Sequence, residues 1–95
     1  MASKEAYQQK LEAQIKEWDA RLEQLRAKAH LASADLRIKY ENELEELARQ
    51  RKSMQKMFEE IGHHSEAAWQ DVKDGAEKAR LEMARAMDKF SNFFK

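Results

Sequence analysis

The feature that most constrains this chain is an apolar seam with a heptad period in its first third. Apolar residues recur there at alternating steps of four and three. This spacing places them on one stripe of an α-helix, which packs against another helix. The seam consists of Leu11, Ile15, Trp18, Leu22, Leu25, Ala29, Ala32 and Leu36. It predicts a long helix whose apolar face needs a partner.

Composition favours helix along the rest of the chain as well. The 95 residues include no proline, only two glycines and 38% charged residues, a balance typical of long helices and coiled coils. β-Branched residues, which favour strands, are scarce. Residues 1–95 are therefore expected to form a single all-α domain.

Clear helix-stop signals occur at one place, in the sequence Gly62, His63, His64, Ser65. Gly62 suits the closing residue of a helix, and Ser65 suits the N-cap of the next. The seam continues to Ile61 through a four-residue stutter at Tyr40, which does not end a helix. We therefore predict a long antiparallel helical hairpin (coiled coil) with a helix over 3–61, a turn at 62–64 and a helix over 65–94.

A three-helix bundle is the alternative fold. Ser33 is a candidate N-cap, and a turn at 31–34 would divide the first helix into two. The two folds differ in what they leave exposed. In the hairpin the second helix ends opposite residue 32, so residues 1–31 stay uncovered, whereas the bundle buries the seam within one chain.

The hairpin predicts self-association, because a large exposed apolar seam usually marks an interface. The interface residues expected on this basis are Leu11, Ile15, Trp18, Leu22 and Leu25. The partner is expected to be a second copy, in a homodimer or a higher homo-oligomer. In the three-helix bundle the same residues need no second chain.

The end of the chain is rich in Phe and Met and has two interpretations. It is either core, or a surface that contacts a partner protein or a membrane surface. The residues concerned are Met87, Phe90, Phe93 and Phe94. Acidic residues balance the basic ones on this segment, so contact with lipid is the second choice.

Other classes of function find little support in the sequence. The neighbours of His63 and His64 follow no metal-binding pattern, and no cofactor motif is present. Two slender helices form no desolvated pocket for catalysis, so we expect no enzyme. The formal net charge is zero, which argues against binding of nucleic acid. With neither a leader nor a membrane-spanning segment, a cytoplasmic location is expected.

Several fragments resemble a family of small bacterial coiled-coil proteins, labelled stress-response proteins after their cyanobacterial members. The fragments are residues 4–7, 10–19, 32–35, 40–41 and 69–75, of which those around Trp18 and Trp69 are the most specific. The resemblance implies a cytoplasmic helical protein with a link to stress and no catalytic residue.

The function expected from the sequence is that of a non-enzymatic structural or adaptor protein. It would act through self-association and other protein–protein contacts. A peripheral protein that lays an amphipathic helix on a lipid surface is the alternative.

Overall fold

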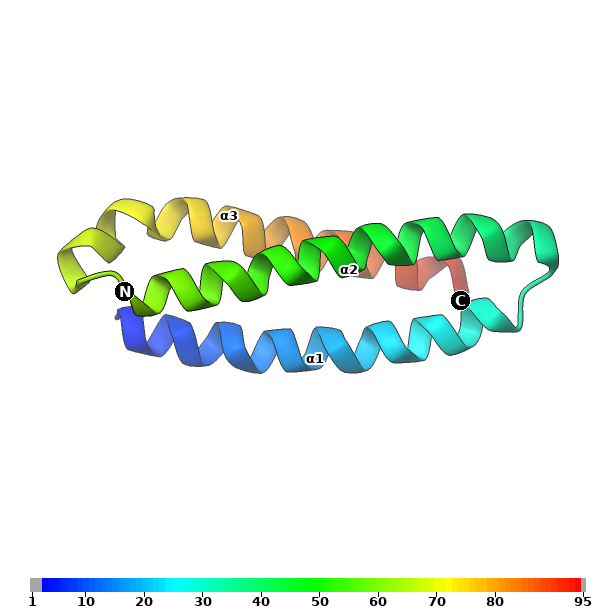
Figure 1. Ribbon diagram of the computed structural model, residues 1–95, viewed down its shortest axis with the longest axis horizontal. Helices are drawn as coiled ribbons and strands as arrows, with labels where there is room; N and C mark the ends of the chain where they lie inside the picture. Colours follow the sequence, from blue (N-terminus) through cyan, green and yellow to red (C-terminus); the bar gives the residue numbers. More distant parts are fainter. Residues whose placement is uncertain (1–2, 95) are drawn as a thin grey trace.

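Three helices form the protein, which is all-α throughout residues 3–94, the part of the chain that this computed structural model describes. Helix α1 spans Lys4–His30, α2 spans Ala34–Gly62 and α3 spans Glu66–Ser91, and a short 3-10 helix, η1, spans Asn92–Phe94. Neighbouring helices run antiparallel, so α3 lies parallel to α1 (Figure 1). The molecule is an elongated rod of 51 × 17 × 17 Å, in which α1 and α2 share the longest interface.

The predicted continuous helix over 3–61 is wrong, and the three-helix alternative with a turn at 31–34 describes the chain. Helix α1 ends at His30, and Ser33 takes an extended conformation (φ −60°, ψ 159°) before α2 begins. The turn is supported by Arg37, whose guanidinium donates to the carbonyl of His30 over 2.9 Å. A straight continuation would leave the seam of α1 in water, whereas folding back buries it.

The predicted turn at residues 62–64 is present between α2 and α3. Ser65 caps α3 as expected, since its hydroxyl accepts from the backbone N–H of Ala68 at 3.1 Å. Gly62 is the last residue of α2, as expected, but it does not adopt the left-handed conformation that a glycine at a helix end favours. No described residue has a positive φ. Helix α3 begins at Glu66, one residue later than predicted.

The seam of α1 forms the centre of the core. Its five largest members are 0 to 4% exposed, because α2 covers one side of the seam and α3 the other. These are the residues predicted for self-association: Leu11, Ile15, Trp18, Leu22 and Leu25. The structure contradicts that assignment, since no face of the seam is left for a second chain. Burial of each large side chain contributes about 1.5–3 kcal/mol to folding.

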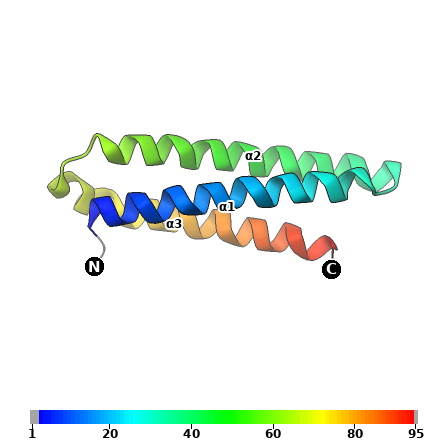
Figure 2. The same cartoon turned by 90° about the horizontal axis from the view of Figure 1, so that it is seen from below.

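The three helices do not end at the same level. The last turn of α3 lies beside Tyr40, whose ring centroid is 5.9 Å from that of Phe90 and 6.2 Å from that of Phe93. The start of α2 and the α1–α2 turn therefore extend past α3 (Figures 1 and 2). We call residues 31–39 the α1–α2 end. Its helical part, residues 34–39, extends over roughly 9 Å at 1.5 Å per residue.

Candidate functional site

Exposed apolar side chains gather at the α1–α2 end. Six large apolar residues are exposed in the described part of the chain, and three of them belong to this end: Leu31 at 88%, Leu36 at 46% and Ile38 at 64%. A fourth, Phe93 at 47%, borders the end, where the Lys39 amino group lies 5.7 Å from its ring centroid. The other two, Val72 and Leu81, lie on α3.

Leu36 and Ile38 are exposed for different reasons. Leu36 is one helical turn before Tyr40 on the stripe of α2 that faces α3, and it is exposed because α3 ends too early to cover it. Ile38 lies three residues before Glu41 and seven before Glu45, so these three share a stripe on the opposite side. Ile38 therefore lies in line with Glu41 and Glu45, two of the residues that line a groove between α1 and α2.

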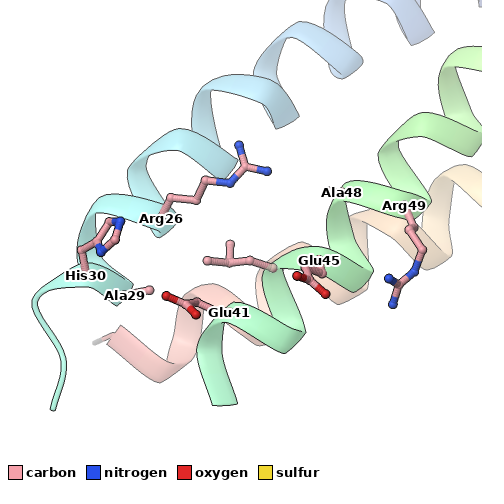
Figure 3. A pocket seen from close by; sticks show the side chains of 8 residues that line it. Arg26, Ala29, His30, Glu41, Glu45, Ala48 and Arg49 are labelled. Carbon is pink, nitrogen blue, oxygen red and sulfur yellow. The ribbon is translucent and has the colours of Figure 1, made fainter. Parts of the chain in front are cut away.

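This groove lies on the α1–α2 pair, beside the turn that joins the two helices. Its floor is apolar, with Ala29 at 2% and Leu44 at 5% exposure. Figure 3 shows the charged side chains on its two walls, which come from different helices. The residues that line it are Arg26, Ala29, His30, Glu41, Leu44, Glu45, Ala48 and Arg49.

The two walls of the groove differ in sign. Arg26 and His30 stand on the α1 wall, and Glu41 and Glu45 on the α2 wall (Figure 3). Within residues 3–94 these four side chains form no ion pair with one another. Arg49 instead pairs with Glu46, at 2.6 Å on α2 itself. The groove thus presents the open positive charge of Arg26 on one side and the open negative charges of Glu41 and Glu45 on the other.

A polar cluster between α1 and α3 has a structural role. Arg80 forms an ion pair with Glu77, and its Nη1 donates to the Gln14 side chain over 2.9 Å. The adjacent Tyr7 packs on Trp69 with ring centroids 4.9 Å apart. Burial, together with the negative charge of Glu77, raises the pKa of Tyr7 to about 12. The cluster joins α1 to α3, with the Arg80 side chain mostly covered at 12% exposure and the Glu77 side chain open to solvent at 37%.

The predicted turn histidines close the opposite end of the rod. The Nδ1 of His64 lies 2.8 Å from the Glu60 carbonyl oxygen, and the Lys4 amino group donates to the His64 carbonyl over 2.8 Å. His63 is exposed beside it. In the described part of the chain, no group of three or more acidic, histidine or cysteine side chains is placed to hold a metal ion.

The predicted contact surface near the C-terminus is mostly core. Met87 is fully buried and Phe90 is 3% exposed, because both pack against α1 and α2, so the structure contradicts their assignment as contact residues. Phe93 is accessible. The side chain of Phe94 lies outside the described residues. The sequence interpretation missed Ile38, although an apolar residue off the heptad is a signal for a second apolar surface.

Comparison with known proteins gives no relative: no family model matches the sequence, and neither a curated protein nor a solved structure is significantly similar. The resemblance to the bacterial stress-response family therefore stays a prediction from the fragments around Trp18 and Trp69. Among residues 3–94, no helix is both long and apolar enough to cross a membrane.

Proposed function

We propose that the protein is a non-enzymatic helical protein of the coiled-coil type, which acts by self-association through its α1–α2 end. The observation that carries this proposal is the 88% exposure of Leu31 and the 64% exposure of Ile38, whereas the seam of α1 from Leu11 to Ala29 is buried. Exposed apolar side chains gathered in one place usually mark a contact surface. Zero net charge supports association between copies, because no overall repulsion opposes it.

The groove favours binding over catalysis. Its carboxylates, Glu41 and Glu45, are exposed to solvent on an outer face of α2. A general acid or base is usually desolvated in a pocket that shifts its pKa. Side chains of this kind instead select and orient a partner.

A membrane surface is the second candidate for the contact. Lys28, Arg37 and Lys39 stand on or beside the α1–α2 end, and basic residues around apolar ones are typical of proteins that bind anionic lipid. Asp35 and Glu41 interrupt this basic character, which favours a protein partner. The fragments that resemble the stress-response family add the proposal of a stress-linked cytoplasmic role, which rests on sequence alone.

The test compares two double variants that each remove two exposed apolar side chains. Leu31→Ser with Ile38→Ser changes the α1–α2 end, and Val72→Ser with Leu81→Ser is the matched control on α3. Sedimentation equilibrium is expected to show association for the wild type and the control, and its loss in the first variant. Equal association of both variants would contradict the assignment. Flotation of the wild type with anionic vesicles, lost in the first variant, would favour the membrane instead.

A further inference from the structure

We propose that the α1–α2 groove receives a second copy of the chain in parallel orientation, with α1 of each copy lying against α2 of the other. This inference rests on the proposed self-association and adds its geometry. The two copies would be related by a two-fold axis that runs along the rod. Most soluble homo-oligomers have such closed symmetry, in which both copies use the same surface.

The register of α1 against α2 determines which charges face each other. Arg51 of α2 binds Asp19 of α1 through two hydrogen bonds of 2.6 and 2.8 Å, so these residues are level. Because the helices are antiparallel, the residue seven positions after Asp19 on α1 is level with the residue about seven positions before Arg51 on α2. Arg26 is therefore level with Glu45, within one residue.

Rotation about an axis along the rod sets the α1 wall of one copy against the α2 wall of the other. It leaves the position of each residue along the rod unchanged. It places Arg26 of one copy opposite Glu45 of the second copy, and His30 opposite Glu41. Symmetry makes each contact twice.

The antiparallel arrangement lacks this complementarity. An axis across the rod would lay α1 of one copy on α1 of the other and α2 on α2. At the level of the groove, Arg26 would then meet its own copy, as would Glu41 and Glu45. Like charges placed opposite each other disfavour that arrangement.

Apolar contact at the α1–α2 end supplies the affinity that exposed ion pairs lack. Exposed charge pairs orient a complex more than they strengthen it. In the parallel arrangement both α1–α2 ends lie at the same end of the dimer. Leu31 comes directly after His30 of the α1 wall, and Ile38 lies one turn before Glu41 of the α2 wall. Leu31 of one copy would therefore approach Ile38 of the other. Two of the most exposed apolar side chains would thereby be covered.

A charge exchange tests the facing of the walls. Arg26→Glu and Glu45→Lys are each expected to weaken the dimer by about tenfold, because each places like charges opposite each other at two symmetric contacts. The double variant R26E/E45K restores opposite signs and is expected to recover wild-type association. Glu82→Lys, on exposed α3, is the matched control without effect. Thermal unfolding by circular dichroism verifies that all variants fold.

Two distance measurements test the orientation. The chain contains no cysteine, so spin labels can be placed singly at Ala34→Cys, in the α1–α2 end, and at Ala67→Cys, at the other end of the rod. In a parallel dimer, each label lies close to the same label on the second copy. For both positions the distance is within about the width of two rods, each 17 Å across. An antiparallel dimer that overlaps at the α1–α2 end brings only the labels at 34 together.

The outcomes separate this inference from the function on which it rests. A chain that stays monomeric at every concentration overturns both. A dimer that is lost in the Leu31→Ser, Ile38→Ser variant but shows a long distance at residue 67, or no recovery in R26E/E45K, overturns the parallel geometry alone. Short distances at both labels with recovery in the double variant support it.

Discussion

Arg51 of α2 clasps Asp19 of α1 through two parallel hydrogen bonds, from Nε to Oδ1 at 2.6 Å and from Nη2 to Oδ2 at 2.8 Å. Arg51 occupies a position on the apolar seam of α2, where a charged residue would otherwise weaken the packing. Its side chain is 28% exposed, so the pair is formed at the border of the core. A bidentate pair of this kind fixes geometry as well as contributing energy.

Loss of this pair is expected to destabilise the fold moderately. Asp19→Asn removes the negative charge that holds the half-buried guanidinium, and we expect a loss of about 1 kcal/mol in the free energy of unfolding. Urea titration followed by circular dichroism measures it. Asp71→Asn, at an exposed position of α3, is the control. An equal effect of both substitutions would contradict the role of the pair.

Trp18 is expected to stabilise the fold of the single chain. It is 1% exposed, and Trp18→Ala would leave a large cavity in the core, at a cost of about 3–5 kcal/mol. The midpoint of urea unfolding reports it, and Trp18→Phe provides a milder variant if the first does not fold. Phe93→Ala, at a half-exposed position, is expected to cost less than about 1 kcal/mol. A fully stable Trp18→Ala protein with altered association would restore the interface assignment.

The caps of α2 and α3 offer a matched pair of substitutions. Ser65 caps α3 through its hydroxyl, whereas the hydroxyl of Ser33 makes no such bond to α2. Ser65→Ala is therefore expected to cost about 1 kcal/mol, and Ser33→Ala clearly less. Thermal unfolding of the two variants side by side measures the difference. A larger loss of stability in Ser33→Ala than in Ser65→Ala would show that the Ser33 hydroxyl stabilises the first turn of α2.

The pKa of Tyr7, raised to about 12, predicts loss of stability in strong alkali. In the unfolded chain tyrosine loses its proton near its ordinary pKa of about 10, so the unfolded state is favoured as the pH rises from about 10 to about 12. Below about pH 10 the stabilisation is complete. Tyr7→Phe is expected to flatten the dependence of unfolding free energy on pH in this window.

Absorbance titration of the phenol tests the same pKa directly. The chain has two tyrosines, so Tyr40→Phe leaves Tyr7 as the only one that titrates. The expected midpoint in the folded protein is about 12. A midpoint near 10 would contradict the burial of the Tyr7 hydroxyl beside Glu77.

Local signals in the sequence were sufficient for one turn and insufficient for the other. Gly62 and Ser65 interrupt the chain with residues that end and begin helices, and the turn lies there. At residues 31–33 only Ser33 marks the turn, and the heptad passes through it unbroken. A heptad reads the same in one long helix as in two that fold back on each other. What distinguishes them is whether the apolar seam of α1 finds cover within the chain.

The groove could not be predicted from the sequence. Arg26 and Glu45 are level because of a register set by tertiary packing, in which Asp19 meets Arg51 across the bundle. The pattern of residues on either helix alone shows only a charged outer face. The exposure of Leu36 likewise depends on where α3 ends relative to Tyr40, which follows from the relative lengths and offsets of all three helices.

The most direct test of this account is the distance, within one chain, between spin labels at Gln9→Cys on α1 and Ala67→Cys on α3, both exposed positions. Dilution with unlabelled protein restricts the signal to single chains. The three-helix fold predicts a distance of about the 17 Å width of the rod, since Lys4 of α1 already touches the α2–α3 turn. A continuous helix over 3–61 would separate the labels by roughly 80 Å at 1.5 Å per residue. That result would return the seam of α1 to the surface and contradict the account.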